Sequence, residues 1–451
     1  MIQKNKSYQA VVEDLTLEGN GICRVDGFTV FVPMTAVGDR IRFKAVKVQK
    51  HYGYGLLEQV VTPAPIRQQV DCPVFRQCGG CAFRHITYEE ELRLKQKAVQ
   101  DAFQRLGGFQ LEPEPILGCE EPDHYRNKAQ YPLGTDRQGK AMAGFYARRS
   151  HRIVPVSDCA LQDPAFGPVV KLVVDFINSR HLAVYDESTG KGLLRHLFLR
   201  RGHRTGEMMV CLVSTSRQIP FLDELIQKLT AAFPHIVSIA LNINKEKTNV
   251  ILGRQTITVY GKDYIDDILL DVKLSIAPAA FYQVNSAQTE RLYQLGYAYG
   301  ELKPDDRLLD LYCGIGSIGL GACSRVASLT GVEVVEAAVD SARRNAAQNQ
   351  LKAEFFCADA GEAARQLADR GETPSIIIVD PPRKGCDEQV LDSIVRMAPE
   401  RVVMISCNPA TAARDCKWLA EHGYQLVKYR PVDLFARTGH VETVCLLTKQ
   451  L

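Results

Sequence analysis

The sequence lacks a long apolar run, has a single tryptophan and carries a net charge of only +3. Its longest purely aliphatic stretches, such as Ile376–Val379, are far shorter than the roughly 20 residues that a membrane-spanning helix needs. The opening residues, MIQKNKSYQA, contain no apolar core of a signal peptide. We therefore expect a cytoplasmic protein without a membrane partner, and nothing in the sequence predicts a protein partner.

Internal repeats and low-complexity segments are also missing, so a fibrous or disordered protein is excluded. With 451 residues, of which 46% are hydrophobic, the chain is long enough for two or three domains with cores of their own. It contains 14 cysteines, which are not expected to form disulfides in a reducing compartment. A tight cluster among them would therefore indicate a metal site or a nucleophile.

The positive charges are concentrated in two stretches. Residues 124–152 contain seven Lys or Arg against one Asp, and residues 191–204 contain five against no acidic residue. The first stretch also contains aromatic residues, which suits phosphate contacts together with base stacking on RNA: Tyr125, Tyr131, Phe145 and Tyr146. Solvated surface loops and aromatic side chains packed in a core remain the alternatives.

Short apolar runs punctuated by glycine occupy the first 60 residues, a pattern typical of a small β-barrel. Pro63 and Pro65 mark a linker, and a charged segment at residues 88–106 has apolar side chains spaced for one face of a helix. The region that follows mixes strand-like and helical runs. We expect three domains, the second of them α+β: residues 1–60, 61–260 and 261–451.

Strand-like and helical runs alternate over the last 150 residues, which predicts an α/β domain of Rossmann-like type with a largely parallel sheet. Ligands of such sheets bind at the carboxyl ends of the strands. Two final strands follow each other without a helix between them, so the sheet should end in an antiparallel pair. The strands are expected at residues 307–313, 328–333, 354–357, 375–380, 401–406, 425–430 and 441–448.

A glycine-rich turn, LDLYCGIGSIGL, lies between the first of these strands and a helix. Glycines such as Gly314 let a cofactor approach the backbone there. Glu333 ends the next strand, where a carboxylate can bind both hydroxyls of a ribose. Since dehydrogenases share such a turn, the turn alone does not identify the cofactor.

Two further motifs follow the next strands of the sheet. DPPRKG begins at Asp380 and SCNP contains Cys407, so both should lie at the same edge. A cysteine between a strand and a helix has amide N–H groups nearby, which should lower its pKa and expose a thiolate. We interpret Cys407 as a nucleophile. The alternatives are a buried packing cysteine and, for Asp380, a structural carboxylate.

Cys72, Cys78 and Cys81 lie within ten residues of one another, and Cys159 is the best candidate for a fourth member of the cluster. Their thiolates would repel one another without a positive centre, and both zinc and a [4Fe-4S] cluster accept four cysteines. Free structural thiols are the third possibility. We expect the remaining cysteines to be packing residues: Cys23, Cys119, Cys211, Cys313, Cys323, Cys357, Cys386, Cys416 and Cys445.

Together, the motifs FYQVN (residues 281–285), LDLYCGIGSIGL, DPPRKG, SCNPAT and HVETV (residues 440–444) resemble those of the RNA (uracil-5)-methyltransferases and occur in the family's order. The resemblance covers nearly the whole chain and is greatest to the branch that acts on 23S rRNA. It implies an OB-like RNA-binding barrel of TRAM type, a cysteine-rich central domain and a class I methyltransferase domain. In this family the helix near residues 88–107 packs on the catalytic domain.

The resemblance also implies the roles of individual residues. Cys407 would be the nucleophile and Glu442 the base. The cysteine spacing is similar to that of iron–sulfur members, so Cys72, Cys78, Cys81 and Cys159 would bind a [4Fe-4S] cluster that shapes the RNA-binding surface. The cofactor would be S-adenosylmethionine, and its contacts would come from Gln283, Tyr312, Gly314, Glu333, Asp380 and, as a weaker candidate, Asp359.

Methylation of uracil at C5 requires these residue types. A thiolate that adds to C6 converts the ring into an enolate whose C5 is nucleophilic, and a base must then remove the C5 proton before the thiolate can leave. The target base must leave its stack so that both faces are reached. We therefore expect an enzyme that forms 5-methyluridine at one or two sites of 23S rRNA.

Other functions remain open at this point. A tRNA uracil-5-methyltransferase would use the same chemistry, and an RNA-binding assembly factor could carry an inactive methyltransferase domain. An amino-group methyltransferase would use the DPP motif without needing Cys407. Cytosine-C5 enzymes usually carry their nucleophile after a proline, whereas Ser406 precedes Cys407 here.

Overall fold

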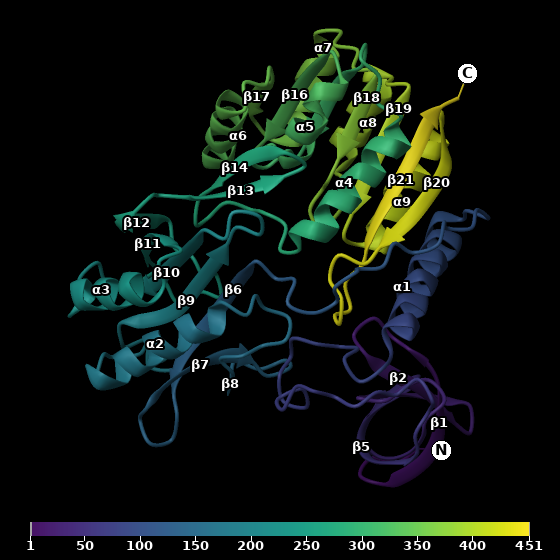
Figure 1. The fold of residues 1–451 in the computed structure, drawn as a ribbon. Helices are drawn as coiled ribbons and strands as arrows, with labels where there is room; N and C mark the ends of the chain where they lie inside the picture. The colour runs from purple at the N-terminus through teal and green to yellow at the C-terminus, as the bar shows by residue number, and fades with distance from the viewer. Residues whose placement is uncertain (1, 451) are drawn as a thin grey trace.

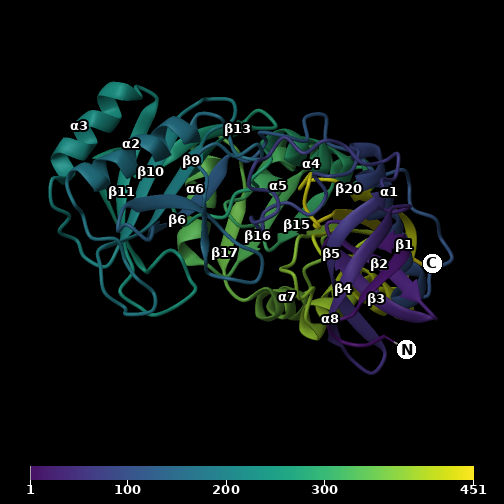
Figure 2. The same ribbon diagram turned by 90° about the horizontal axis from the view of Figure 1, so that it is seen from below.

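The computed structural model of the chain describes residues 2–450 (Figure 1), so the outermost residues of the expected first and third domains, Met1 and Leu451, lie outside it. Three bodies make up the molecule: a five-stranded closed barrel, a central seven-stranded sheet with two helices, and a C-terminal seven-stranded sheet covered by helices. Seen from below, the barrel and the central body lie toward opposite ends of the molecule (Figure 2). In the described part of the chain, no helix is long and apolar enough to cross a membrane.

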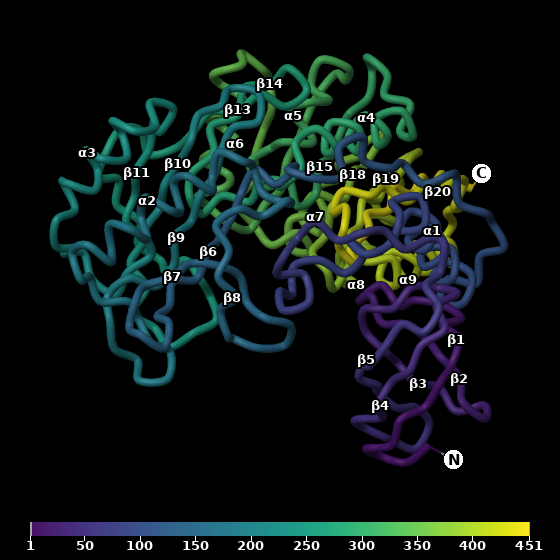
Figure 3. The backbone as a smooth tube through the Cα atoms, turned by 60° about the horizontal axis from the view of Figure 1, so that its bottom comes forward, coloured from purple at the N-terminus to yellow at the C-terminus, as the bar shows by residue number. Residues whose placement is uncertain are grey.

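The N-terminal barrel confirms the expected small β-barrel. Strand β5 pairs in parallel with β3 and antiparallel with β4, which closes the barrel in the order β1-β2-β3-β5-β4. Inward side chains such as Val30, Val32 and Phe43 fill its interior, while the alternate residues face outward. The strands are β1 (Ser7–Leu15), β2 (Asn20–Val25), β3 (Phe28–Pro33), β4 (Arg40–Val48) and β5 (Tyr52–Thr62). The barrel projects away from the rest of the chain (Figure 3).

The central body is a seven-stranded sheet in the order β12-β11-β10-β9-β6-β7-β8. Helices α2 (Phe166–Ser179) and α3 (Leu222–Ala232) cover one face. On the other face, Phe198, Met209 and Cys211 belong to a core that continues into the C-terminal body. The strands are β6 (Lys128–Thr135), β7 (Ala141–Tyr146), β8 (Ile153–Pro155), β9 (Leu194–Arg201), β10 (Met208–Ser214), β11 (Ile236–Ile243) and β12 (Gln255–Gly261).

Helix α1 (Tyr88–Ala102) lies between the barrel and the C-terminal body (Figure 1). Thr87 caps its start by accepting a hydrogen bond from Glu90 N, and acidic residues in the first turn suit the helix dipole. A π-helical turn (Phe103–Gly107) continues the helix. Phe103 stacks on Tyr429 of the C-terminal sheet, with ring centres 4.2 Å apart, so this early helix packs on the last part of the chain.

The C-terminal sheet has the strand order β17-β16-β15-β18-β19-β21-β20. Strands β15 to β19 are parallel, and β21 runs antiparallel between β19 and β20. The expected antiparallel pair at one edge is therefore confirmed. The strands are β15 (Arg307–Leu311), β16 (Ser328–Glu333), β17 (Glu354–Cys357), β18 (Ile376–Val379), β19 (Arg401–Ser406), β20 (Tyr424–Val432) and β21 (Glu442–Lys449).

Helices cover both faces of this sheet, which explains why its parallel strands are apolar throughout. Along β18, Ile376 and Ile378 contribute to the core on one face, while Ile377 and Val379 contribute to the core on the other. Helices α4 (Ser286–Gly300), α5 (Ser317–Ala322, followed by a 3-10 turn at Cys323–Arg325) and α6 (Glu336–Gln348) lie on the first face. The second face carries α7 (Ala360–Asp369), α8 (Glu388–Met397), α9 (Pro409–Glu421) and α1. A hairpin, β13 (Ile265–Leu269) and β14 (Val272–Ile276), precedes α4.

Candidate functional site

The candidate site lies at one edge of the C-terminal sheet, where the carboxyl ends of the parallel strands meet the beginning of β21. The structure brings most of the sequence-predicted residues to this edge because each follows a different strand of one sheet. They are Tyr312 and Gly314 after β15, Glu333 at the end of β16, Asp359 after β17, Asp380 after β18, Cys407 after β19 and Glu442 at the start of β21.

The glycine-rich turn after β15 holds the carboxylate of Glu333. Tyr312 and Gly314 have left-handed backbone angles (φ 67° and 57°), which curl the turn toward the end of β16. Gly314 N donates to Glu333 Oε2 at 3.1 Å, and Val335 N donates to Oε1 at 2.9 Å. Each carboxylate oxygen can accept more than one hydrogen bond, so the fixed Glu333 side chain still has capacity to bind a ligand.

Asp310 is a residue of this turn that the sequence analysis missed. It is fully buried on β15 and accepts a hydrogen bond from Gly319 N at 2.9 Å. Burial raises the pKa of Asp310 to about 8, and Asp380 and Glu333 raise it further, against the effect of Gly319 N. An acidic residue inside an otherwise apolar strand was the available signal for it.

The FYQVN segment before α4 is held by the central body. The Arg200 guanidinium, 1% exposed, donates to the carbonyls of Ala277 and Ala280 at 2.9 and 2.8 Å. Asn127 donates from Nδ2 to Gln283 O at 2.9 Å. The central sheet thus fixes the segment that carries Gln283, whose side-chain amide has no hydrogen-bond partner among residues 2–450.

The loops that follow β18 and β19 are joined to each other. Asn408 Nδ2 donates to Arg383 O at 3.0 Å, while Asn408 Oδ1 accepts from Ala410 N at 3.1 Å and caps α9. Cys407, next to Asn408, is half-buried between the two loops. The asparagine therefore ties the Asp380 loop to the start of the helix that follows Cys407.

Cys407 and Glu442 come together through the antiparallel pairing of β19 with β21. Ser406 pairs with Thr443 in this ladder. Because the strands are antiparallel, Cys407, which follows Ser406, lies opposite Glu442, which precedes Thr443. Glu442 is 2% exposed. No hydrogen bond within residues 2–450 occupies its carboxyl group. The side chain is therefore available for proton transfer close to the thiol.

The expectation that the pKa of Cys407 is lowered overall is wrong for the free protein, although a backbone N–H does act in that direction. Burial raises the pKa of Cys407 to about 11, and the carboxyl groups of Glu442 and Asp380 add to this effect, while Arg383 opposes it. Burial also raises the pKa of Asp380 to about 7 and that of Glu442 well above its usual range. Three acidic groups share one poorly hydrated space, so the site retains protons at neutral pH.

Residues 433–437, which join β20 to the segment before Glu442, are each held by a side chain or backbone group from the first 285 residues. We name this stretch the 433–437 loop. The Asp433 carboxylate accepts hydrogen bonds from Tyr88 and Lys95 at 2.7 and 2.6 Å. The next three carbonyls each accept one side-chain hydrogen bond: Leu434 O from Asn285 at 3.1 Å, Phe435 O from Lys95 at 3.2 Å and Ala436 O from Tyr125 at 2.9 Å. Arg437 O accepts from the backbone amides of Ala82 and Phe83 at 2.8 and 3.2 Å.

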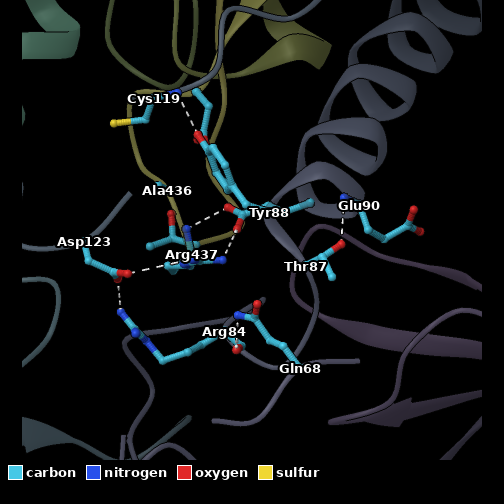
Figure 4. Close-up of polar contacts among 12 residues, drawn as sticks. Gln68, Arg84, Thr87, Tyr88, Glu90, Cys119, Asp123, Ala436 and Arg437 are labelled. Carbon is cyan, nitrogen blue, oxygen red and sulfur yellow. Dashed lines mark hydrogen bonds and ion pairs between the residues drawn. The ribbon is translucent and has the colours of Figure 1, made fainter. Parts of the chain in front are cut away.

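Arg437 is the point where three segments meet (Figure 4). Its backbone N donates to Glu91 Oε1 at 2.7 Å, and its guanidinium lies over the ring of Tyr88, 5.3 Å from the ring centre. Asp123 lies 3.8 Å from the same guanidinium and also bonds Arg84, which follows the cysteine segment. A left-handed backbone (φ 66°) is unfavourable for arginine, and these contacts hold it.

The four clustered cysteines line a single cavity of about 50 Å³: Cys72, Cys78, Cys81 and Cys159. Arg84 and Arg126 line it too, and Arg148 donates to Cys81 O at 2.5 Å. Burial raises the pKa of Cys81 to about 11. Within residues 2–450, no three His, Cys, Asp or Glu side chains form a group that could hold a metal ion.

A large cleft of about 960 Å³ opens in front of Cys407. Its walls come from four parts of the chain: the barrel, the cysteine segment, the loop after β7 and the loops of the catalytic edge. Representative lining residues are Tyr54, Gly80, Arg149, Arg383, Cys407 and His440.

The structure buries part of the two basic stretches and leaves most of their cations at least partly exposed. The interpretation of the exposed ones as RNA contacts stays a prediction. Tyr131 is fully buried and Arg126 lines the cysteine cavity instead of the surface. In the second stretch, Arg195 and Arg200 lie inside β9 and bond backbone carbonyls. Of the cations in these two stretches, Arg148 and Arg149 in the loop after β7 line the large cleft.

Most of the cysteines expected to be packing residues are buried, but two are not. Cys357, at the end of β17, is exposed, and Cys323 is half-buried. Both lie at ends of elements around α6, where the sequence pattern alone does not separate a core position from a surface one.

The tRNA (uracil-5-)-methyltransferase family model matches residues 87–450. Similar proteins include uncharacterized RNA methyltransferases of Clostridium tetani, 40% identical over 448 residues (99% of this chain, 97% of the relative), and of Halalkalibacterium halodurans, 41% identical over 448 residues (99% and 98%). Among solved structures, that of Pyrococcus abyssi tRNA (uracil-54, C5)-methyltransferase in complex with S-adenosyl-L-homocysteine is similar, with a TM-score of 0.79 and 28% identity over 98% of this chain and 100% of the other.

These matches agree with the architecture. The C-terminal body has the class I methyltransferase fold, with β21 inserted antiparallel beside β20. The family model begins at residue 87 and so leaves out the barrel, whereas the relatives cover the barrel as well. The chain belongs to the RNA uracil-5-methyltransferase family.

Proposed function

We propose that this protein is a 23S rRNA (uracil-C5)-methyltransferase that forms 5-methyluridine, with Cys407 as the nucleophile and Glu442 as the base. The observation that carries the proposal is the position of Cys407 opposite Glu442, directly beyond the Ser406–Thr443 pair that ends the antiparallel ladder of β19 and β21, and beside Asp380. An amino-group methyltransferase needs neither a thiol nor a base beside it. Membership of the family supports the same chemistry.

S-adenosylmethionine supplies the methyl group in this proposal, and the catalytic edge suits it. The fixed Glu333 carboxylate would take the ribose hydroxyls. Asp359 uses Oδ1 to accept the amides of Gly361 and Glu362, which leaves Oδ2 for the adenine edge. Val334 is 62% exposed and Phe356 is 40% exposed at neighbouring strand ends, and they offer an apolar surface for the adenine ring.

Gln283, Tyr312, Gly314 and Asp380 would complete the cofactor site. The free side-chain amide of Gln283 can donate two hydrogen bonds and accept others. Gly314 has the left-handed backbone of the turn, and a side chain added there would meet no atom within 4 Å. Glycine therefore suits the left-handed backbone at this position, and without a side chain it leaves the space beside the turn open.

The chain's own residues would act in order. The Cys407 thiolate adds to C6 of uracil, which makes C5 nucleophilic toward the methyl group. Glu442 then removes the proton from C5, and the thiolate leaves. Because the pKa of Glu442 is raised well above its usual range, its carboxylate form is a stronger base than an exposed glutamate. Arg383, the one cation that lowers the pKa of Cys407, favours the thiolate.

The four cysteines would bind a [4Fe-4S] cluster. All four line one cavity, and four cysteine thiolates are the usual ligands of such a cluster. Arg84, Arg126 and Arg148 lie beside the thiols and would offset the negative charge of a thiolate-bound cluster. Iron and sulfide near four per chain in anaerobically purified protein is the expected result, and one zinc per chain would contradict it.

The barrel would be the TRAM module of this enzyme, and the whole assembly would act on 23S rRNA. The alternative substrate is tRNA, because the similar P. abyssi enzyme is a tRNA methyltransferase. The test is to incubate the protein with unmodified 23S rRNA and, separately, unmodified tRNA, and to map 5-methyluridine by mass spectrometry. If 5-methyluridine forms only in tRNA, the substrate is tRNA and not rRNA. If it forms in neither RNA, the proposed function is overturned.

A further inference from the structure

The outer surface of the barrel carries an aromatic group where most barrel surfaces are polar. Tyr52 and Tyr54 alternate with the buried glycines of β5, so both point outward. Phe31 on β3 lies against them, with ring centres 5.8 Å from Tyr52 and 5.7 Å from Tyr54. Leu56, the next outward residue of β5, is 57% exposed. We call Phe31, Tyr52, Tyr54 and Leu56 the barrel face.

The barrel face continues into the cleft that contains Cys407. Tyr54 and Leu56 line this cleft together with Val46, which is 39% exposed in the neighbouring strand β4. Neither Tyr52 nor Tyr54 uses its hydroxyl in a hydrogen bond within residues 2–450. The rings are therefore half-buried against one another, while their edges and hydroxyls are available to a ligand.

The charge around the cleft suits a polyanion. Its lining contains four Lys or Arg residues and a single acidic residue, Glu18. Lys47 pairs with Tyr54 on the barrel, and Arg148 and Arg149 line the same cleft from the loop after β7. The fourth cation, Arg383, lies next to Cys407. Aromatic rings on an OB-like barrel combined with a cationic path are the pattern that binds unpaired nucleic acid.

We propose that the barrel face is a second nucleobase site, which stacks an unpaired base of the same RNA whose uridine reacts at Cys407. The phosphates between the two bases would lie along Lys47 and Arg149. This inference rests on the proposed function and adds to it a class of substrate. The RNA must present two unpaired nucleotides, one for Cys407 and one for the barrel face, so a continuous duplex is excluded.

The first test measures binding of a fluorescein-labelled oligouridylate of about twelve nucleotides by fluorescence anisotropy. Tyr54→Ala should weaken binding roughly 5- to 150-fold, as expected for the loss of one stacked base. Tyr54→Phe should bind like the unchanged protein because it keeps the ring. Val11→Ala is the matched control, since Val11 is an exposed apolar residue of the same barrel (45% exposed) and is not among the residues that line the cleft.

Duplex RNA of the same length separates stacking from charge. It should bind weakly to the unchanged protein, and Tyr54→Ala should leave that binding unchanged. Equal binding of oligouridylate by Tyr54→Ala and the unchanged protein would overturn the second site. A change of Tyr54→Ala from dimer to monomer in gel filtration, with unaltered RNA binding, would likewise overturn it, because the face would then contact a second copy of the chain.

A coupling experiment places the two sites on one RNA. The RNA is the one that the unchanged protein methylates, and each nucleotide other than the target uridine is replaced in turn by an abasic one. One of these replacements should weaken binding to the unchanged protein as much as Tyr54→Ala weakens binding to the unchanged RNA. Combining that substitution with Tyr54→Ala should cost little more than either alone. Full additivity at every position would contradict the proposal. If no RNA is methylated while Tyr54→Ala still weakens oligouridylate binding, the proposed function fails and the nucleobase site remains.

Discussion

The N-terminal half and the C-terminal body contribute to the catalytic edge in different ways. The C-terminal sheet supplies the reactive side chains, each directly after a strand, as Asp380 and Cys407 show. The N-terminal half supplies buried cations that hold loops, as Lys95 and Arg200 show. Within residues 2–450, no hydrogen bond occupies the buried carboxyl group of Glu442, whereas the buried cations of the N-terminal half bind carboxylates and carbonyls. The C-terminal body therefore serves the chemistry and the N-terminal half the geometry.

The buried cations also differ in how they are balanced. Lys95 is fully buried between two carboxylates, Glu91 and Asp433, at 2.7 and 2.6 Å. Within residues 2–450, Arg200 has no carboxylate partner, and burial lowers its pKa to about 10, so carbonyl groups and the ring of Phe198 compensate its charge. Substitution at the catalytic edge should therefore abolish chemistry and spare folding, whereas substitution of these cations should disturb folding as well.

The largest effect is expected for Cys407→Ala. Without addition to C6 the ring carbon is too weak a nucleophile, so the rate of methylation should fall by more than about 10³-fold. Binding of S-adenosylmethionine, measured by calorimetry, should be unchanged. Cys357→Ala, which removes an exposed thiol near the same edge, is the control and should be active. Appreciable activity of Cys407→Ala would favour an amino-group methyltransferase.

Glu442→Gln should be the next most severe change, with turnover about 10²- to 10⁴-fold slower. The thiolate still adds and the methyl group is still transferred, but the proton on C5 is not removed. A covalent protein–RNA adduct should therefore accumulate and survive a denaturing gel. The double variant Cys407→Ala, Glu442→Gln should form none. Normal turnover without an adduct would show that another group, or water, removes the proton from C5.

Lys95→Met tests the geometric role of the N-terminal half. It leaves the carboxylates of Glu91 and Asp433 buried without their cation, which should cost about 3–5 kcal/mol of unfolding free energy, measured by chemical denaturation. It should also slow turnover, since the 433–437 loop precedes Glu442. Lys97→Met, on the exposed side of the same helix, should cost less than about 1 kcal/mol.

The loss in Lys95→Met should depend on pH. Burial raises the pKa of Glu91 to about 7, Lys95 lowers it and Asp433 raises it, so removal of the lysine raises it further. When the pKa of a group is higher in the folded state than in the unfolded state, the free energy of unfolding has its full value at a pH below the unfolded-state pKa. It falls as the pH rises through the folded-state pKa. The variant should therefore be more destabilised at pH 8 than at pH 5. Equal losses at both would show that charge is not the cause.

The smallest effect is expected for Arg383→Ala, measured as alkylation of Cys407 by iodoacetamide with mass spectrometry of its peptide. Removing the cation that lowers the pKa of Cys407 should raise that pKa further, and alkylation at pH 8 should be roughly three- to tenfold slower. Arg383→Lys should restore the rate. An unchanged alkylation rate in Arg383→Ala would show that the arginine does not activate the thiol.

The C-terminal fold could be predicted because its information is local. Apolar strands such as Ile376–Val379, helical periods between them and motifs at their ends all lie within short windows of sequence. The edge that carries Asp380 and Cys407 follows from the parallel order of the strands. The division into domains at residues 60 and 260 stays a prediction.

The rest depends on contacts between distant segments. Nothing near Lys95 indicates that its partner is Asp433, and nothing near Arg126 indicates that it faces the cysteine cavity. The wrong direction for the pKa of Cys407 has the same origin. The helix that follows it was visible in the sequence, but the burial of the thiol and the carboxyl group of Glu442, brought by β21, were not.

The position of β21 has a consequence for biosynthesis. The ribosome makes the barrel, the central sheet and the nucleophile before it makes Glu442, and only then can β21 enter between β19 and β20. Domains generally fold in the order of their synthesis, but α1 packs on the C-terminal sheet, so Lys95 and Tyr88 can take their places only when that sheet has formed. A nascent chain that ends before β21 therefore holds Cys407 without its base, and the catalytic centre is completed only after β21 has been made.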